Sequence, residues 1–567
     1  MSRAYKIALL SSSGKYLTTD YDGNVSLDNV PKRLPKGQQW TLESSAPEGD
    51  GSLSSVYAIY STNGHYLTVD KSGKVSVDAE EPKEEQQFEI DVGCCGSGGW
   101  LLRNVAQDMC LSSKNKKVLC KKQQMQKMDQ KWFVRLDIHP HVCLFSEAKQ
   151  CYGRVHAGRL AFDTTVPWQS NALFTLKYTE GYGYFQDAEG KYLSREGRMM
   201  RDCCPQCLFV LEVTGDRVRL KDYSGHYLSV NTRGRLLSTT GKDRATFDIK
   251  LSYPHVTFHQ NVKGTWMKLF AKEGCSELVS IEASKCEDHE DETIFELSPL
   301  SLSTTPNSKW ALTTADNRYL IVDTEGKLCV SKSATHTAKQ FEFEFVANAF
   351  VLRHSHTSQC VRIDDSGRPY LTANIINEST RLALELVNRP RLILRGEYGY
   401  IKVEGSGKKN KVRCDSAEFD DLGLTYEPET NTYRIAVLGE IPKYWSLDSL
   451  HEHVIVTDAD NRTSFIVEMH VLCGRALLAF RPLQNNDMNY LKGYKGGALT
   501  ASVPTYSSVG RGVFSPVSSL VPVSAVCSSV RFLSSLKVDV DVLDVVNAVN
   551  GVAVFDVEDM STDSTDA

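Results

Sequence analysis

A short phrase built on Tyr-Leu recurs from one end of the chain to the other, and it constrains the fold more than any other feature. Five well-preserved copies follow a Gly or Asn turn, and their tyrosines are Tyr16, Tyr66, Tyr192, Tyr227 and Tyr319. Weaker copies fill the intervals, centred on Cys110, Tyr152, Trp266, Cys360, Tyr400, Tyr444 and Tyr490. The mean spacing of about 43 residues predicts a chain of repeated supersecondary units.

Each unit has the pattern of four short strands. An alternating apolar segment leads to a turn, the Tyr-Leu strand, a second turn, a short strand such as GNVSLD or GKVSVD, and a closing strand. The closing strands are anchored by Trp40, Phe88, Trp132, Phe174, Phe209, Phe247, Phe295, Phe341 and Phe465, with Leu384, Leu424 and Phe514 as weaker counterparts. This pattern predicts an all-β protein. We expect the repeated tyrosines and the closing aromatics to fill the core.

A second, longer period groups the units in threes. A proline followed by an alternating apolar segment precedes the fourth, seventh and tenth units, at Pro140, Pro254 and Pro390. Three such units supply enough strands for a six-stranded barrel capped by three hairpins, which is the β-trefoil, and a closed barrel has no unpaired edge. A WD40 propeller also has four strands per unit, but its GH…WD signature is absent.

The sequence therefore predicts an all-β chain of four tandem β-trefoils. The expected ranges are 5–137, 138–252, 253–387 and 388–516, followed by a tail of uncertain structure at 517–567. The uncharged stretch 512–530 contains six serines and two prolines, which argues against a membrane span. The segment KVDVDVLDVV that follows alternates as a strand does.

The composition excludes several classes of function. Lys and Arg number 65 against 70 Asp and Glu, so the net charge of −5 does not attract the whole chain to nucleic acid or to a membrane. The apolar run from Ile7 to Leu10 is shorter than the core of a secretory signal. We therefore expect a cytoplasmic protein whose 16 cysteines are mostly reduced.

Motifs for catalysis or cofactor binding are absent from the sequence. It contains no G-x-S-x-G and no H-E-x-x-H, and the Gly-rich loop around Cys94 and Cys95 lacks the spacing of a phosphate-binding loop. The segment CCPQC at 203–207 contains a C-x-x-C pair, but no second pair at zinc spacing accompanies it. We expect no enzyme activity, no metal and no cofactor.

Several phrases closely resemble the fascin family of actin-bundling proteins. They are GKYLT near the N-terminus, QQWTLE at 38–43, HPHV at 139–142, DETIFEL at 291–297, RPRLILRGEYGYI at 389–401 and NYLKGYKGGALTAS at 489–502. The resemblance extends from about residue 5 to about residue 516. It implies a monomeric cytoplasmic protein of four β-trefoils that cross-links actin filaments into tight parallel bundles, as in filopodia, without catalysis.

The actin filament is acidic, so an actin-binding face needs Lys and Arg on a rigid surface. The resemblance implies one principal actin site across a cleft between the first and fourth trefoils. Its residues are matched by Lys15, Lys36, Arg395, Glu397 and Lys492, and our candidate set also contains Lys32, Arg33, Tyr398, Lys402 and Lys495. For each lysine the alternative is an ordinary solvated turn residue.

Bundling also requires a second actin-binding surface. The densest basic cluster of the chain lies in the third unit, with Lys114, Lys116, Lys117, Lys121 and Lys122. A second actin face and a merely solvated hairpin are both open interpretations, and a homodimer would supply bivalency in another way. Arg33 occupies the place where animal fascins carry a regulatory serine, so that phosphorylation switch is excluded here.

A carbohydrate-binding or protein-scaffold module is the alternative function. Ricin-type lectins carry a Gln-x-Trp triplet in every unit, whereas this sequence has two such triplets, ending at Trp40 and Trp132. Two triplets are what core tryptophans beside a polar strand produce by chance. Binding of signalling proteins through the trefoils is a further possibility that the sequence leaves open.

Overall fold

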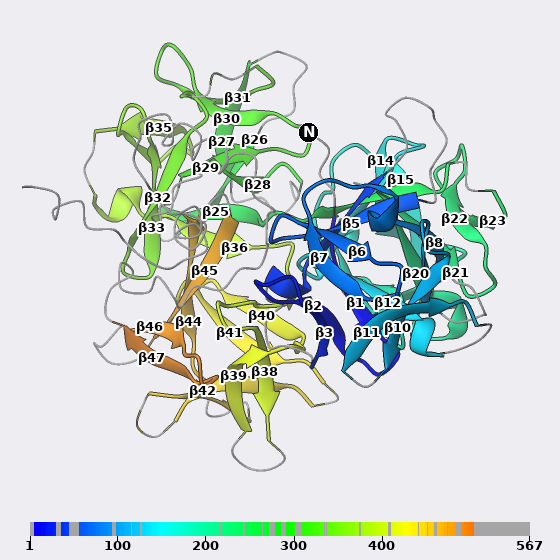
Figure 1. The fold of residues 1–567 in the computed structure, drawn as a ribbon. Helices are drawn as coiled ribbons and strands as arrows, with labels where there is room; N and C mark the ends of the chain where they lie inside the picture. The colour runs from blue at the N-terminus through cyan, green and yellow to red at the C-terminus, as the bar shows by residue number, and fades with distance from the viewer. Residues whose placement is uncertain are drawn as a thin grey trace, which may run out of the picture.

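The computed structural model describes most of the chain up to residue 503 (Figure 1). The described ranges are 5–29, 36–44, 56–92, 98–114, 116–124, 128–214, 217–241, 244–262, 265–271, 278–284, 291–300, 309–333, 335, 337–373, 376–405, 410–439, 441–448, 450, 452–458, 462–472, 475–483 and 489–503. The predicted tail lies outside these ranges. Helical structure within them consists of single 3-10 turns, namely η1 (Lys36–Gln38), η2 (Glu84–Gln86), η4 (Met128–Gln130), η5 (Ser170–Ala172), η6 (Pro205–Cys207) and η7 (Glu378–Thr380). None of these helices has the length and apolar character needed to cross a membrane.

The first twelve strands form a closed barrel with three hairpins. The barrel strands are β1 (Lys6–Ser11), β4 (Trp40–Ser44), β5 (Val56–Ser61), β8 (Gln87–Val92), β9 (Trp100–Asn104) and β12 (Trp132–Leu136). Each pairs with the next, and β12 pairs back with β1. The hairpins join β2 (Tyr16–Thr19) to β3 (Val25–Asp28), β6 (Tyr66–Val69) to β7 (Val75–Ala79) and β10 (Met109–Lys114) to β11 (Lys117–Lys122).

The second group of twelve strands repeats this topology. Its barrel strands are β13 (His141–Ser146), β16 (Phe174–Thr179), β17 (Tyr182–Gln186), β20 (Phe209–Thr214), β21 (Arg217–Asp222) and β24 (Thr246–Leu251), and β24 pairs back with β13. The hairpins join β14 (Cys151–His156) to β15 (Arg159–Thr164), β18 (Tyr192–Leu193) to β19 (Met199–Met200) and β22 (Tyr227–Val230) to β23 (Leu236–Thr239).

The third group has the same order. Its barrel strands are β25 (His255–Val262), β28 (Ile294–Pro299), β29 (Lys309–Thr313), β32 (Phe341–Val346), β33 (Ala349–His354) and β36 (Ala383–Leu386). The barrel closes because β36 pairs with β25 and a bridge joins Phe350 to Leu382. The hairpins join β26 (Thr265–Ala271) to β27 (Leu278–Ser284), β30 (Tyr319–Val322) to β31 (Leu328–Ser331) and β34 (Cys360–Ile363) to β35 (Pro369–Thr372).

The fourth group follows the same plan over its described part. Five barrel strands are present, β37 (Arg391–Leu392), β40 (Leu422–Glu427), β41 (Thr432–Val437), β44 (Phe465–Leu472) and β45 (Arg475–Pro482). The hairpins join β38 (Tyr400–Glu404) to β39 (Asn410–Ser416), β42 (Lys443–Leu447) to β43 (Val454–Thr457) and β46 (Tyr490–Gly493) to β47 (Leu499–Val503). The strand expected around Phe514 lies outside the described residues. The protein therefore consists of four tandem β-trefoils, as predicted, while the residues at which one passes to the next stay a prediction.

The turn before each well-preserved Tyr-Leu strand explains the Gly or Asn of the phrase. Gly14 has φ +73° and Asn317 has φ +63°, in the left-handed region that Gly and Asn adopt at low cost. The N–H of Gly14 donates to the Ser11 carbonyl at 2.9 Å, and the N–H of Asn317 donates to the Thr314 carbonyl at the same distance. The repeated residue therefore fixes a repeated tight turn.

The closing aromatics lie in the core, as expected, but the repeated tyrosines do not all do so. The nine closing aromatics, from Trp40 to Phe465, are at most 1% exposed. In the Tyr-Leu pair it is the leucine that joins the main core, as Leu17 and Leu67 show with 0% exposure. Successive side chains on a strand point to opposite faces, so only one of the pair can face the barrel. Tyr16, Tyr66 and Tyr227 are nevertheless buried, with 4%, 8% and 6% exposure, whereas Tyr192 and Tyr319 are half buried, so the expectation for the tyrosines is confirmed only in part.

The tyrosines on the other face use their hydroxyl groups. The Tyr66 hydroxyl donates to a Glu43 carboxylate oxygen at 2.6 Å, and Tyr227 does the same to Glu212 at 2.8 Å. In the fourth trefoil the Tyr490 hydroxyl donates to a carboxylate oxygen at 2.9 Å. These bonds explain how a phenol is accommodated outside the apolar core.

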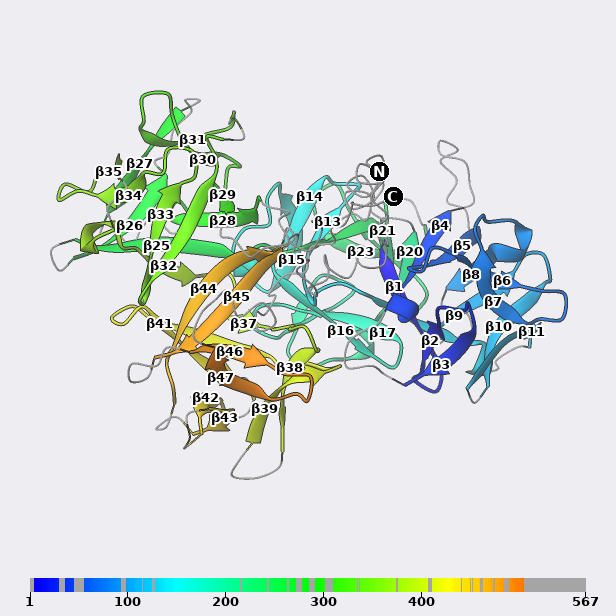
Figure 2. The same cartoon turned by 60° about the vertical axis from the view of Figure 1, so that its left-hand side comes forward.

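The four trefoils are associated as two pairs. One apolar cluster extends through the first and second trefoils, and another through the third and fourth. Figure 2 shows the first trefoil (blue) at one end of the molecule and the second between it and the other two. The contact between the pairs is largely polar, since Arg389 donates to the Ser252 carbonyl at 2.7 Å and a ring nitrogen of His139 lies 3.3 Å from the Ile393 carbonyl oxygen.

Candidate functional site

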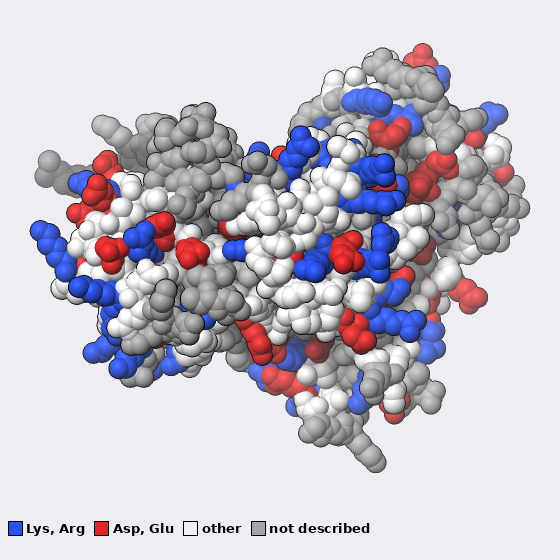
Figure 3. Space-filling model, turned by 90° about the vertical axis from the view of Figure 1, so that its right-hand side faces the viewer, with Lys and Arg blue, Asp and Glu red and all other residues white. Residues whose placement is uncertain are grey.

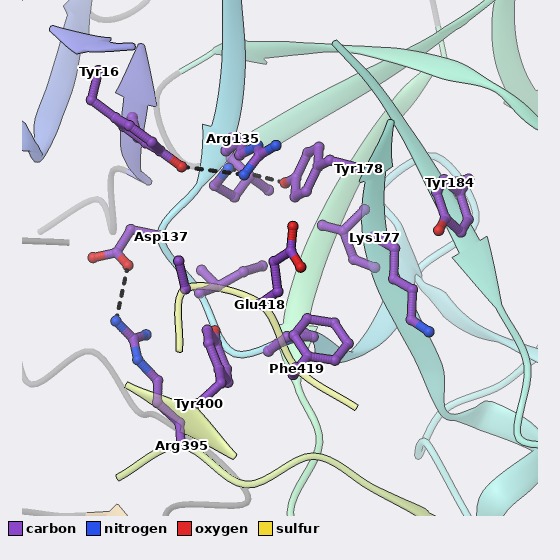
Figure 4. Close-up of a pocket in the computed structure, with 16 residues that line it drawn as sticks. Tyr16, Arg135, Asp137, Lys177, Tyr178, Tyr184, Arg395, Tyr400, Glu418 and Phe419 are labelled. Carbon is purple, nitrogen blue, oxygen red and sulfur yellow. Dashed lines mark hydrogen bonds and ion pairs between the residues drawn. The ribbon is translucent and has the colours of Figure 1, made fainter. Parts of the chain in front are cut away.

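A hollow of about 410 Å³ lies where the first, second and fourth trefoils meet (Figure 4). We call it the junction hollow. Its lining includes Tyr16, Arg135, Asp137, Lys177, Tyr178, Tyr184, Arg395, Tyr400, Glu418 and Phe419. The hollow therefore combines aromatic rings with charges of both signs, brought together from segments more than 200 residues apart.

Arg135, on the last strand of the first trefoil, connects two trefoils across the hollow. It donates to the Tyr16 hydroxyl at 3.2 Å, and its guanidinium carbon lies 5.7 Å from the centre of the Tyr178 ring. The Tyr178 hydroxyl in turn accepts the N–H of Leu136 at 3.0 Å. A cation above an aromatic face is attracted by the ring quadrupole, so Arg135 holds the two trefoils together while lining the hollow.

Arg395 enters the hollow from the fourth trefoil and is already engaged. Its guanidinium lies 3.6 Å from the Asp137 carboxylate and 5.3 Å from the centre of the Tyr400 ring, and its side chain is 17% exposed. Asp137 belongs to the segment between the first two trefoils. The predicted site residue Arg395 therefore ties the fourth trefoil to the first pair of trefoils and presents little of its charge to solvent.

Three more ion pairs lie around the hollow. Asp421 accepts from Lys177 at 2.9 Å and from Arg391 at 2.8 Å, with all three side chains largely buried. The Lys402 ammonium pairs with Glu418, and this hydrogen bond raises the pKa of Lys402. These pairs join the second trefoil to the fourth and fix the loop that carries Glu418.

The structure places the other predicted residues of the principal site as follows. Lys15 lies half exposed in the turn before β2, beside Tyr16 of the hollow. Glu397 and Tyr398 lie half buried in the segment between β37 and β38. Lys32 and Arg33 lie outside the described residues, and Lys36 is described only as part of η1, without its side chain.

Lys492 and Lys495 lie on a different hairpin from Arg395. Lys492 is half exposed on β46, with its ammonium 5.2 Å from the centre of the Tyr494 ring, and Lys495 is exposed in the following turn. A bridge between Arg413 and Ala498 sets β47 beside β39, which pairs with the strand of Lys402. The fourth trefoil thus carries Lys402 and Lys492 on one continuous set of strands.

The basic cluster of the third unit lies entirely on the β10–β11 hairpin. Lys114 is directly opposite Lys117, and both are exposed, as are Lys116 and Lys122. Lys121 is half exposed. Beside this hairpin a second hollow, of about 570 Å³, is lined by Lys74, Lys116 and Lys117.

Sequence reasoning missed residues of the second and fourth trefoils that line the junction hollow or lie beside it. Lys177 and Tyr178 stand in an ordinary alternating strand, and Asp421 stands in an acidic pair that resembles a solvated turn. Their roles arise from contacts between trefoils, which leave no local pattern in the sequence. The C-x-x-C pair, by contrast, is visible in the sequence, and the structure places the sulfurs of Cys204 and Cys207 3.7 Å apart.

Comparisons with known proteins agree with this architecture. The model of the Fascin domain family matches residues 31–134 and 142–247. Fascin-2 of Bos taurus is 24% identical over 514 residues, covering 89% of this chain and 96% of its own length. Fascin of Strongylocentrotus purpuratus is 26% identical over 519 residues, covering 88% of this chain and 97% of its own.

Solved structures match over about a quarter of the chain. A designed three-fold symmetric protein, ThreeFoil, matches with 22% identity and a TM-score of 0.19, covering 24% of this chain and 99% of its own. The BEL β-trefoil matches with 20% identity and a TM-score of 0.21, covering 24% of this chain and 95% of its own. The Fascin domain model thus matches the first two trefoils, and fascins of two animals align with nearly the whole chain, so this chain is similar to fascins over most of its length.

Proposed function

We propose that the protein binds filamentous actin and cross-links filaments into tight parallel bundles. The observation that carries this proposal is the alignment with fascins over 88–89% of this chain and 96–97% of theirs, which retains all four trefoils. We further propose that it acts as a monomer in the cytoplasm, at the actin cytoskeleton, without catalysis. Bundling needs two separate actin-binding surfaces on one rigid body, and four joined trefoils provide such a body.

We propose that the principal surface is formed by cations at the rim of the junction hollow and on the neighbouring hairpin. Lys495 is exposed and Lys15 and Lys492 are partly exposed, so their charges are available to an acidic filament. Lys402 is 32% exposed and its ammonium is paired with Glu418, so its charge is partly compensated. Arg395 is assigned a positioning role, because its guanidinium is occupied by Asp137 and Tyr400. Lys32, Arg33 and Lys36 belong to the same proposed surface by their place in the sequence.

We propose the β10–β11 hairpin as the second surface. Lys114 and Lys117 face each other across its two strands, an arrangement of like charges that destabilises a sheet. An acidic partner would relieve that repulsion. The hairpin belongs to the first trefoil, whereas most of the principal surface belongs to the fourth.

A carbohydrate-binding function is not favoured by the comparisons or by the tryptophans that suggested it. Trp40 and Trp132 are both 0% exposed. Their indole N–H groups donate to the Leu17 carbonyl at 3.1 Å and the Leu111 carbonyl at 2.9 Å. These rings are core residues and offer no face on which a sugar could stack.

Sedimentation with purified filamentous actin tests the proposal, at high speed for binding and at low speed for bundling. We expect the wild-type protein to carry actin into the low-speed pellet and the Lys15→Glu/Lys492→Glu variant to lose this activity. The control is Lys327→Glu/Lys332→Glu, which changes the charge equally on exposed residues of the third trefoil.

The outcomes separate the site from the function. If the wild-type protein stays in the supernatant at both speeds, even at low salt, the actin proposal is wrong. If both double variants lose bundling equally while their melting temperatures are unchanged, actin binding is retained as the function and the assignment of the principal surface is wrong.

A further inference from the structure

The cap of the second trefoil is a rigid platform of three hairpins, β14–β15, β18–β19 and β22–β23. Backbone hydrogen bonds tie them together, since Leu160 N–H donates to the Gly197 carbonyl at 2.7 Å and Phe162 N–H donates to the Gly234 carbonyl at 2.8 Å. Met199 N–H donates to the Gly158 carbonyl at 2.9 Å. The backbone positions from which the side chains of this platform extend are therefore fixed relative to one another.

The register of the hairpins brings arginines to one face. Arg159 on β15 lies opposite His156 on one side and Arg198 on the other. Ala161, two residues further along β15, lies opposite Arg154 on one side and Arg235 on the other. Residues two apart share a face of a strand, so these side chains all lie on the outer face of the three hairpins.

The burial of β15 agrees with this arrangement. Leu160 and Phe162, which alternate with Arg159 and Ala161, are 3% and 1% exposed and face the core. We call the outward set the arginine grid; it consists of Arg154, His156, Arg159, Arg198 and Arg235 around Ala161. Ala161 has a small side chain, so it leaves space above the centre of the grid for the longer side chains around it.

The positive charge of the grid is only partly compensated. Arg154 donates to Asp163 at 2.8 and 3.3 Å, and Arg198 lies 3.7 Å from Glu196, both partners being exposed. Neither Arg159 nor Arg235 makes an ion pair within the described part of the chain. Directly opposed residues have Cβ atoms about 4.5–5.5 Å apart, and like charges at that distance destabilise a sheet.

The rim of the grid adds more positive than negative charge. Arg201 and Arg233 are exposed in the same hairpins, with Asp202 as an acidic neighbour. The Lys149 ammonium is held at the edge by the Thr232 carbonyl at 2.9 Å. Figure 3, which faces this side of the molecule, shows Lys and Arg side chains gathered over the second trefoil.

We propose that the arginine grid binds a compact ligand that carries several phosphate groups, of the inositol polyphosphate class. The guanidinium fork matches the oxygens of a phosphate with two parallel hydrogen bonds. Several phosphate groups on one small ring can each pair with an arginine of a single patch. The ligand can be a free inositol polyphosphate or the headgroup of a phosphoinositide.

This site is separate from the surfaces proposed for actin. Those surfaces use residues of the first and fourth trefoils, and the grid lies wholly in the second. A failure of the actin proposal therefore leaves this one intact, and the reverse also holds.

Isothermal titration of the full chain with inositol hexakisphosphate tests the proposal. We expect saturable binding that weakens by at least about tenfold in the Arg159→Gln/Arg235→Gln variant, because each arginine supplies charge-assisted hydrogen bonds. The matched control is Lys332→Gln/Arg368→Gln, which removes two exposed charges from the third trefoil, where Arg368 follows a turn glycine as Arg198 and Arg235 do. The control should bind within about twofold of wild type, since it leaves the phosphate contacts in place.

A second arm uses phosphatidylcholine vesicles that contain a phosphatidylinositol bisphosphate, with phosphatidylserine vesicles of equal charge for comparison. Binding to the phosphoinositide vesicles identifies the headgroup as a ligand, and binding to inositol hexakisphosphate alone identifies the free form. Without ligand, we expect the grid variant to melt no lower than wild type, because it relieves repulsion between like charges.

Three results would overturn the proposal. The first is no binding of either probe by wild-type protein. The second is an equal loss of binding in the grid variant and the control, which would indicate a diffuse charge effect. The third is a grid variant that keeps its affinity for phosphate but loses actin bundling, which would make the cap an actin-binding face instead.

Discussion

At the scale of single residues, the two side chains of the repeated Tyr-Leu pair lie in different environments. Leu17 and Leu228 are wholly buried in the apolar core, whereas Tyr227 packs outside it and donates to Glu212. Burial and the neighbouring carboxylate raise the pKa of Tyr227 well above its usual value, so the phenol stays protonated and remains a donor. At Tyr66 and Tyr227 the repeated pair therefore provides a hydrogen bond as well as an apolar contact.

Phe247 provides a test of the closing aromatics. Its ring is 1% exposed and its centre lies 5.7 Å from that of Phe162. Phe247→Ala should lower the free energy of unfolding by about 3–5 kcal/mol, because the cavity it leaves cannot fully collapse. Urea denaturation measures this change. A loss below about 1 kcal/mol would contradict the assignment of Phe247 to a tightly packed core.

His141 should make the protein sensitive to mild acid. Neither of its ring nitrogens has a hydrogen-bond partner among the described residues, and burial lowers its pKa well below the usual 6.5. The unfolded chain then binds a proton more readily than the folded one, so stability is lost as the pH falls below about 6.5. Urea midpoints measured from pH 7.5 to pH 5 should fall more gently for His141→Leu than for wild type.

Other buried histidines also contribute to the loss of stability in acid. Burial also lowers the pKa of His255, His354 and His470, so the variant should keep part of the acid sensitivity. Parallel slopes for wild type and variant would show that His141 titrates as it does in the unfolded chain.

At the scale of the element, the same turn serves two purposes in different trefoils. Gly14 and Gly190 have φ values of +73° and +84°, and both precede a Tyr-Leu strand. A Cβ added at Gly14 would have no neighbour within 4 Å, whereas one added at Gly190 would lie 2.2 Å from an Arg391 nitrogen. The second turn therefore also forms part of the contact between the second and fourth trefoils.

The pair of substitutions Gly14→Ala and Gly190→Ala separates these purposes. Each should cost about 1–2 kcal/mol for the left-handed conformation. Gly190→Ala should cost more, because it also displaces Arg391, which pairs with Asp421 and donates to the Glu189 carbonyl. Thermal unfolding of both variants measures the difference. Equal losses would mean that Arg391 moves aside without affecting stability.

At the scale of the whole molecule, two pairs of trefoils with apolar cores meet across a polar contact. Asp421 is central to this contact, because it neutralises Lys177 of one pair and Arg391 of the other. Asp421→Asn should destabilise the protein by about 1–3 kcal/mol, since it weakens hydrogen bonds to two largely buried cations. Calorimetry should show the unfolding of the two pairs becoming less concerted.

Glu325→Gln is the control for that variant. Glu325 pairs with Lys327 on the surface, where both side chains are about 70% exposed, so its loss should change stability by less than about 1 kcal/mol. Equal effects of the two substitutions would contradict a special role for the contact between the pairs.

The sequence alone determined the local repeat and, through it, the fold class. Turn residues, strand alternation and closing aromatics are short-range patterns, and Trp40 and Phe88 lie in the core that those patterns predict. The prolines that group the units in threes indicated the trefoil, because three hairpins close a six-stranded barrel. Lys114 and Lys117 also appeared as a cluster, since a hairpin brings near neighbours in sequence together.

Only the tertiary structure decided which residues meet across trefoils. Tyr16, Arg135 and Arg395 come from three distant segments, and their contacts depend on how whole barrels dock. The arginine grid has the same origin, because Arg159, Arg198 and Arg235 are separated by a hairpin or more in sequence and become neighbours only through the three-fold cap. A local pattern encodes a turn or a strand, but long-range register and barrel docking depend on the packing of many side chains at once, which no single stretch of sequence specifies.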